Sequence, residues 1–167
     1  MSVGTPMSIK ATGVQFSEEL TILIVDDDES GPLQIRRILR DVNPSTNVLD
    51  AVDGLEALTL LRDKTVHRGR MLVLLDLHMP RMDGLSFLKQ VRQDPQLRRL
   101  PVVVLTSSDT LQDKAEAYRL GISGYFRKPV TFAGLAQLIQ TLASYWEAAD
   151  LPPPGVARPH KSASIVP

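Results

Sequence analysis

Five short apolar runs alternate with five stretches of helical periodicity along this chain, and that alternation constrains the fold more than any other feature. Several of the runs are apolar on both faces, as in strands that helices cover from two sides. A strand–helix unit repeated five times predicts an α/β fold, a doubly wound five-stranded parallel sheet with five helices. The predicted strands are Thr21–Val25, Asn47–Ala51, Met71–Leu75, Val102–Leu105 and Ser123–Phe126.

Residues that favour helix ends mark the segments between the strands. Ser, Thr and Asp accept hydrogen bonds from the free amides of a first turn, proline suits that turn, and glycine suits the C-terminal end. The expected helices are 30–41 with Pro32 just inside its start, one capped by Asp53, Gly84–Gln93, one capped by Asp109 that ends at Gly121, and one capped by Thr131 that ends at about Trp146.

The two ends of the chain differ in composition from the part between them. Residues 1–19 are small, polar and aperiodic, which predicts a flexible N-terminal arm. Residues 147–167 are rich in proline, which disfavours a helix or a central strand, and they are too few for a second domain. The expected organisation is an arm, one domain over residues 20–146, and a proline-rich tail.

Composition removes several classes of function. The absence of cysteine excludes disulfides, thiolate metal sites and cysteine nucleophiles. Nineteen basic residues balance nineteen acidic ones, which argues against non-specific binding to nucleic acid or an anionic membrane. The apolar run Met71–Leu75 is far too short to cross a bilayer, and the N-terminus does not read as a signal peptide. The cytoplasm is the expected location.

Polar side chains follow four of the predicted strands. Three aspartates, Asp26–Asp28, follow the first strand, and Asp76 follows the third. The fourth strand runs into 106–108 (Thr-Ser-Ser), and Lys128 comes shortly after the fifth. Taken singly, an acidic cluster after a strand is usually a solvated turn or a helix cap. Because the carboxyl ends of parallel strands meet at one edge of a sheet, where ligands bind, the joint occurrence favours a functional site.

The residue types at this edge suit phosphoryl chemistry. Converging carboxylates repel each other and favour a cation, and oxygen ligands favour a hard one, Mg²⁺, or Mn²⁺ in its place. A carboxylate can also attack phosphorus and form an aspartyl phosphate. Such a transfer needs mainly positioning and charge neutralisation, to which the Thr106 hydroxyl and the Lys128 ammonium could contribute.

Four motifs at these strand ends carry a resemblance to a known family: ILIVDDDES, LLDLHMPRMDG, VVVLTSSD and GYFRKP. With them the chain resembles the receiver domain of two-component response regulators, from about Leu20 to Trp146. The resemblance implies a flavodoxin-like (βα)5 fold with strand order 2-1-3-4-5. It also implies a phosphoacceptor protein and not an enzyme. Such a protein catalyses its own phosphorylation and dephosphorylation and receives the phosphoryl group from a partner histidine kinase.

The resemblance gives each residue at the strand ends a role. Asp76 is the expected phosphoacceptor. The expected metal ligands are Asp27, Asp76, the backbone carbonyl of His78 and, through a water, Asp26. The expected contacts of the phosphoryl group are Thr106, Ser107 and Lys128.

Further roles follow from the same resemblance. The Lys128–Pro129 peptide bond is expected to be cis. Thr106 and Tyr125 would form a switch, in which the hydroxyl moves toward the phosphate and the ring turns into the vacated space. The imidazole of His78 and the side chain of Ser108 would lie over the site and tune hydrolysis of the phosphoaspartate.

The C-terminal half, with AYRLGISGYFRKP and a last helix ending in Tyr145 and Trp146, resembles the small stand-alone regulators paired with bacterial phytochrome histidine kinases. That branch implies a homodimer formed through the last helix, with Tyr145 and Trp146 as contacts. The alternative is that both aromatic residues pack the helix end on the core. No DNA-binding output module is expected, so signalling would run through protein contacts.

Two other functions fit parts of the pattern. A receiver that only scaffolds partners, independent of phosphorylation, is disfavoured because the acidic residues, Thr106 and Lys128 are all present. A phosphohydrolase of haloacid-dehalogenase type also uses an aspartyl nucleophile, but it needs a second aspartate two residues later, where this chain has His78.

Overall fold

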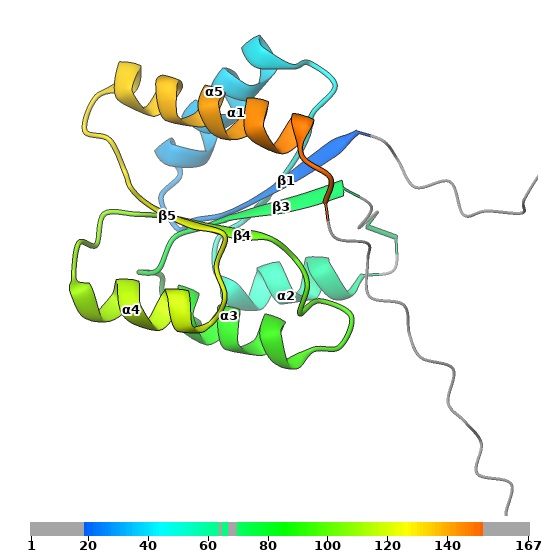
Figure 1. Ribbon diagram of the computed structural model, residues 1–167, viewed down its shortest axis with the longest axis vertical. Helices are drawn as coiled ribbons and strands as arrows, with labels where there is room; N and C mark the ends of the chain where they lie inside the picture. Colours follow the sequence, from blue (N-terminus) through cyan, green and yellow to red (C-terminus); the bar gives the residue numbers. More distant parts are fainter. Residues whose placement is uncertain (1–18, 64, 67–69, 152–167) are drawn as a thin grey trace, which may run out of the picture.

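The computed structural model describes residues 19–63, 65–66 and 70–151. Most of the predicted N-terminal arm and most of the proline-rich tail lie outside these ranges. The described residues form one α/β unit in which strands and helices alternate strictly (Figure 1). Among the described residues, no helix is both long and apolar enough to cross a membrane.

The predicted parallel sheet is confirmed, in the order β2-β1-β3-β4-β5. Each strand begins and ends within one residue of its predicted positions. They are β1 Leu20–Val25, β2 Asn47–Ala51, β3 Arg70–Leu75, β4 Val102–Thr106 and β5 Gly124–Arg127.

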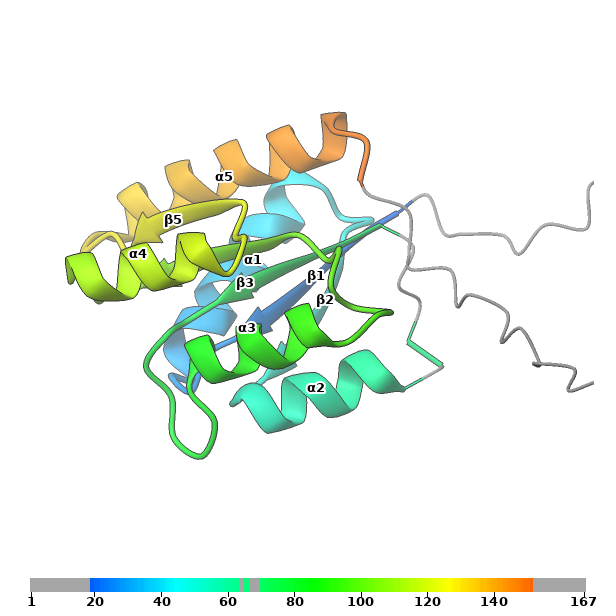
Figure 2. The same cartoon turned by 60° about the horizontal axis from the view of Figure 1, so that its bottom comes forward.

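Five helices cover the two faces of the sheet. Helices α1 and α5 pack on one face, and α2, α3 and α4 pack on the other (Figures 1 and 2). The helices are α1 Ser30–Val42, α2 Gly54–Arg62, α3 Gly84–Gln93, α4 Leu111–Arg119 and α5 Phe132–Ala148.

The central strands have continuous apolar sequences because both of their faces are buried. Ile22 and Ile24 of β1 face the cluster under α1 and α5, whereas Leu23 and Val25 face the cluster over α2 to α4. Each fully buried side chain of this kind contributes roughly 1.5–3 kcal/mol. The edge strands β2 and β5 are only partly buried, which explains why their sequences are less apolar.

Helix capping agrees with the sequence at two predicted sites and differs at one. Asp53 accepts a hydrogen bond from the amide of Glu56, and Thr131 accepts one from Gly134, as predicted. The cap assigned to Asp109 was wrong, because Thr110 has the extended backbone of a cap and accepts from the amide of Asp113. Asp109 pairs with Arg127 instead, at 3.1 Å.

The last helix continues two residues beyond its predicted end at Trp146. Arg70, at the start of β3, donates hydrogen bonds to the carbonyls of Trp146, Glu147 and Ala149, at 3.0, 2.9 and 3.3 Å. A cation at a helix C-terminus satisfies carbonyls that have no partner within the helix. This clamp fixes the end of α5 against the sheet.

Candidate metal centre

The predicted acidic residues meet at the carboxyl edge of the sheet. The Asp26 amide donates to the carbonyl of Ala51 at 3.0 Å, and the Asp76 amide donates to the carbonyl of Val25 at 2.9 Å, so the strand ladder continues past β1 and β3. One carboxylate oxygen from each of Asp26, Asp27 and Asp76 lies within 4.8 Å of the others. Asp26 and Asp76 are buried, whereas Asp27 is exposed.

Lys128 reaches the same cluster from the loop after β5. Its Nζ donates to Asp26 Oδ2 at 2.8 Å and to Asp76 Oδ2 at 3.2 Å. Burial alone would lower the pKa of Lys128, but its contacts with the two carboxylates outweigh burial and raise it. The ammonium therefore stays charged between them.

The charge of the cluster fits a divalent cation. Three carboxylates and one ammonium leave a formal excess of two negative charges. Burial raises the pKa of Asp26 despite its contacts with Lys128 and the Asp28 amide, so the site resists a full set of negative charges without a cation. Oxygen donors of this kind suit a hard ion such as Mg²⁺ or Mn²⁺.

The loop between β3 and α3 places His78 beside this cluster. The His78 amide points toward Asp76 Oδ1, at 3.4 Å. Its imidazole is 65% exposed, and Nε2 lies 3.4 Å from Asp113 Oδ2 at the start of α4. The side chain therefore contacts α4, and the backbone is the part of His78 that lies next to the phosphoacceptor candidate.

Glycine is required where this loop enters α3. The Gly84 amide donates to the carbonyl of Leu77 at 2.9 Å. A Cβ at position 84 would lie 2.3 Å from the carbonyl oxygen of Asp76, a contact that the backbone cannot tolerate. Gly84 thus lets α3 begin directly against Asp76.

Thr106 ends β4 as a fully buried residue beside the site. Its Oγ1 accepts a weak hydrogen bond from the Ser108 amide at 3.3 Å, and the Lys128 amide donates to its carbonyl at 2.8 Å. Ser107 is exposed, and Ser108 is buried. The Ser108 hydroxyl donates to Asp113 at 2.7 Å, which lowers the pKa of that carboxyl.

Tyr125 lies next to this loop on β5. Its hydroxyl donates to the Ser108 carbonyl at 3.1 Å, and the ammonium of Lys114 lies 5.7 Å from its ring centre. Burial is the main cause of its raised pKa, and nearby carboxylates add to it. The ring is partly buried against the core, and this position is compatible with the predicted switch role.

The expected cis bond before Pro129 was wrong. No peptide bond among the described residues is cis, so Lys128–Pro129 is trans. The trans form of an X–Pro bond is favoured by about 0.5–1 kcal/mol. Lys128 reaches Asp26 and Asp76 with the bond in this form.

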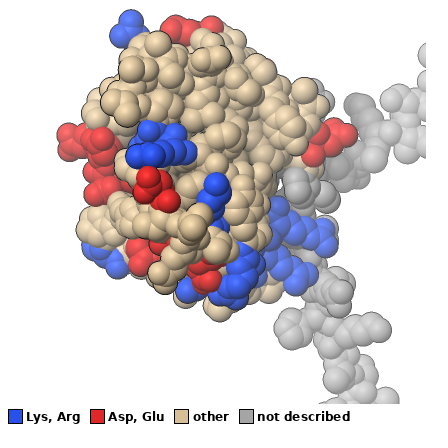
Figure 3. All heavy atoms as spheres, turned by 60° about the vertical axis from the view of Figure 1, so that its left-hand side comes forward, with Lys and Arg blue, Asp and Glu red and all other residues tan. Residues whose placement is uncertain are grey.

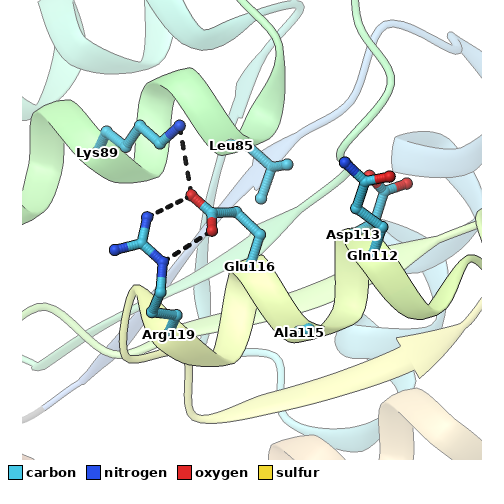
Figure 4. A pocket seen from close by; sticks show the side chains of 7 residues that line it. All are labelled: Leu85, Lys89, Gln112, Asp113, Ala115, Glu116 and Arg119. Carbon is cyan, nitrogen blue, oxygen red and sulfur yellow. Dashed lines mark hydrogen bonds and ion pairs between the residues drawn. The ribbon is translucent and has the colours of Figure 1, made fainter.

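Sequence reasoning missed Asp113 and Arg81. Asp113 joins Ser108 to His78, and Arg81 pairs with Asp53. The contacts His78–Asp113 and Asp53–Arg81 join segments far apart in the chain, and no local pattern marks them. Asp113 also lines a cleft of about 510 Å³ between α3 and α4, where Glu116 bridges Lys89 and Arg119 (Figure 4).

Known proteins share this sequence pattern. A family model described as the response regulator receiver domain matches residues 22–140. Response regulator Rcp1 of Synechocystis sp. is 31% identical over 135 residues, which cover 78% of this chain and 92% of Rcp1. Chemotaxis protein CheY of Pseudomonas aeruginosa is 36% identical over 124 residues, which cover 74% of this chain and 95% of CheY.

Solved structures share the fold. The phosphorylated cyanobacterial phytochrome response regulator RcpA has a TM-score of 0.74 and 31% identity, covering 80% of this chain and 99% of RcpA. The Mn²⁺-bound form of Rcp1 has a TM-score of 0.71 and 32% identity, covering 79% of this chain and 98% of that one. With its strand order and its match over residues 22–140, the chain belongs to the response regulator receiver domain family.

Proposed function

We propose that this protein is a response regulator in which Asp76 of the receiver domain accepts a phosphoryl group from a partner histidine kinase, with Mg²⁺, or Mn²⁺ in its place. The observation that carries the proposal is the position of Lys128. Its ammonium contacts Asp26 and Asp76 at once, while Asp27 brings a third carboxylate within 4.8 Å. A nucleophile, a cation and metal ligands thus share one site.

The phosphoryl transfer follows from these groups. A carboxylate oxygen of Asp76 attacks phosphorus, a P–O bond forms, and the P–N bond of the kinase phosphohistidine breaks with its electron pair kept by the imidazole nitrogen. Lys128 neutralises a phosphoryl oxygen, and the hydroxyls of Thr106 and Ser107 donate to others. When bound, Mg²⁺ supplies further neutralisation of phosphoryl charge. Attack of water on phosphorus later releases inorganic phosphate and restores the carboxylate.

The readout rests on Thr106 and Tyr125. Movement of the Thr106 hydroxyl toward the phosphoryl group would break its contact with the Ser108 amide. Tyr125 holds the same loop through the Ser108 carbonyl, so its ring is placed to respond to that movement. Phosphorylation would then bias one small bistable element and alter the surface around β4, α4 and β5.

We expect the kinase to dock on the surface around the site. Single exposed apolar side chains are ordinary, but a group at one edge indicates a docking surface. Several lie in the loops or first helical turns at the edge that holds Asp76, namely Leu33, Val52, Leu55, Leu111, Val130 and Phe132. Similarity to Rcp1 and to the phytochrome response regulator RcpA supports a phytochrome-type kinase as the partner. The proposed location of both proteins' encounter is the cytoplasm.

A homodimer through α5 is part of the proposal. The helix carries one charged residue, Glu147, and Figure 3 shows an uncharged area over the upper part of the molecule, where α5 runs. Tyr145 is 62% exposed, whereas Trp146 is only 9% exposed and packs in the core. Of the two aromatic residues, only Tyr145 is therefore proposed as a dimer contact. Light scattering should show a dimer that Tyr145→Asp weakens, and a monomer with and without phosphorylation would refute it.

The phosphoacceptor role is tested by incubation with Mg²⁺ and a small acyl phosphate, followed by intact mass measurement. We expect the mass of one added phosphoryl group on the wild type and none on Asp76→Asn. No addition to the wild type would favour a scaffold that works without phosphorylation. Sustained turnover of a phosphomonoester would favour a phosphohydrolase.

A further inference from the structure

Asp53 is a fully buried carboxylate with two functions in the fold. Its Oδ1 accepts a hydrogen bond from the Glu56 amide at 2.9 Å and caps α2. Its Oδ2 pairs with the guanidinium of Arg81, in the loop between β3 and α3. A buried carboxylate is costly without a partner, so this ion pair holds the loop against the start of α2.

Arg81 adopts a backbone conformation that favours glycine or asparagine. Its φ is 63°, in the left-handed region, which is unfavourable for a residue with a Cβ. Its side chain is 60% exposed, yet the guanidinium reaches a carboxylate that is only 1% exposed. The contact with Asp53 offsets the backbone cost of an arginine at this position.

Backbone contacts make the same connection between the two loops. The Gly54 amide donates to the carbonyl of Met82 at 3.2 Å. A Cβ at position 54 would lie 2.7 Å from Met82 Cγ and 2.9 Å from Phe87 Cβ, so the two segments are in close contact. The loop of residues 77–83 is therefore fastened at one end by Arg81 and Met82 and at the other by the Gly84 amide on Leu77.

The Asp53 segment is joined to the acidic pair as well. The carbonyl of Ala51, two residues before Asp53, accepts a hydrogen bond from the Asp26 amide at 3.0 Å. One side of the metal centre, Asp26 and Asp27, is thus linked to the β2–α2 loop. The other side, Asp76 and the backbone of His78, belongs to the loop that Arg81 fastens to the same place.

We propose that Asp53 and Arg81 are positioning residues for the divalent cation. Their ion pair sets the distance between the Asp26–Asp27 segment and the Asp76–His78 segment, and so the affinity of the site for metal. This inference rests on the proposed function, because it concerns the same metal centre. Removal of a group that hydrogen-bonds to a metal ligand and orients it typically changes metal affinity about 10–100-fold.

The test is calorimetric titration of the full chain with Mn²⁺ and with Mg²⁺. Arg81→Asn removes the charge and suits a positive φ, so it relieves the backbone while it breaks the ion pair. We expect metal affinity several-fold weaker, up to about 10-fold, for Arg81→Asn and Asp53→Asn, because this pair acts through the backbone of the ligand segments and not by a direct hydrogen bond to a ligand. Arg81→Lys keeps a cation near Asp53 and should recover most of the affinity.

The matched control is Arg119→Asn. Arg119 is 68% exposed and pairs with Glu116 in the cleft between α3 and α4 (Figure 4), so it resembles Arg81 in exposure and pairing but lies away from the metal centre. The metal affinity of the Arg119→Asn variant should equal that of the wild type. Circular dichroism checks that each variant is folded.

Two failures are distinguishable. A wild type that binds neither cation would overturn the metal centre itself and with it the proposed function. A wild type that binds metal, with Arg81→Asn and Asp53→Asn equal to it, would overturn the positioning role alone. If Arg81→Asn does not fold, Arg81→Lys and Asp53→Asn decide the question, and wild-type affinity in Asp53→Asn refutes the inference.

Discussion

The Asp26 carboxylate occupies a position that disfavours its own charge. Its side chain is 4% exposed and burial raises its pKa, while the nearby Asp76 carboxylate raises it further. Because the folded-state pKa lies above the unfolded value of 3.8, the stability that Asp26 contributes is fully present below that pH and is lost as pH rises through the folded pKa. At neutral pH the metal-free site therefore holds repulsion that a cation would relieve.

Asp26→Asn should accordingly stabilise the metal-free protein at pH 7. The amide keeps the size of the side chain and removes the buried charge, so we expect a higher melting temperature in EDTA. The gain should shrink toward pH 4, where the wild-type Asp26 is increasingly protonated. Differential scanning calorimetry at several pH values measures both effects.

The control for this prediction is Asp28→Asn. Hydrogen bonds from Ser30 lower the pKa of Asp28, so its contribution to stability is present above pH 3.8 and is lost as pH falls through the folded pKa. We expect no gain from this variant at neutral pH. An Asp26→Asn protein that melts at or below the wild-type temperature at pH 7 would contradict the interpretation of Asp26.

At the scale of elements, α4 is the most weakly packed helix. Ala117 is its only buried residue, so polar contacts at the start of the helix are important for its attachment to the rest of the domain. Ser108 donates to Asp113 at 2.7 Å, and His78 lies 3.4 Å from the same carboxylate. These contacts connect α4 to Thr106 through Ser108, which suits an element that moves on phosphorylation.

Asp113→Ala should loosen α4 without changing metal binding. The variant removes the acceptor of the buried Ser108 hydroxyl, which we expect to cost about 1–3 kcal/mol. Hydrogen–deuterium exchange should become faster across Leu111–Arg119. Asp109→Ala, which breaks only the exposed pair with Arg127, should cost at most about 1 kcal/mol. Equal exchange in both variants would refute a special role for Asp113.

The start of α3 gives a second prediction at this scale. Gly84→Ala places a Cβ against the Asp76 carbonyl, and only a backbone shift can relieve that contact. We expect a loss of about 3 kcal/mol in the free energy of unfolding, with lower phosphorylation because Asp76 itself must move. Chemical denaturation measures the loss. Ser86→Ala, on the exposed side of the same turn, is the control, and equal stability of the two variants would contradict the geometry.

At the scale of the whole molecule, two arginines tie the ends of helices to the sheet. Arg70 holds the carbonyls at the end of α5. Arg92 donates to the carbonyls of Leu120 and Gly121 after α4 and to those of Arg98 and Leu100 before β4. Both clamps lie at the amino edge of the sheet, opposite the metal centre, so they stabilise the fold without taking part in the chemistry.

Arg70→Ala should therefore separate stability from function. Loss of charged hydrogen bonds to several carbonyls should cost about 1.5–3 kcal/mol, measured by chemical denaturation. Metal affinity and phosphorylation of the folded fraction should stay at wild-type values. Arg99→Ala, in the exposed turn before β4, is the control with no expected effect. A changed metal affinity in Arg70→Ala would show that the two edges of the sheet are coupled.

Most of the fold could be predicted from the sequence because the central strands are buried on both faces and are therefore recognisable as continuous apolar runs. The sequence also placed the site, since strand ends in a parallel sheet share one edge. What it could not predict depended on distant partners. The sequence predicts Asp53 as a helix cap, but its ion pair with Arg81 forms only because two distant loops meet in the folded chain. Trp146 is buried because it packs on the assembled sheet, which the local sequence does not reveal. Thr110 and Asp109 are both good capping residues, and only the backbone path selects between them.

The central claim is that Asp76 carries the phosphoryl group. Borohydride reduction of the phosphorylated protein converts an aspartyl phosphate into homoserine, which peptide mass spectrometry can locate. We predict homoserine at position 76, dependent on added Mg²⁺ or Mn²⁺ and strongly reduced in Lys128→Met. Homoserine at another aspartate, or a phosphoryl group that resists reduction because it sits on a serine or threonine, would contradict the account.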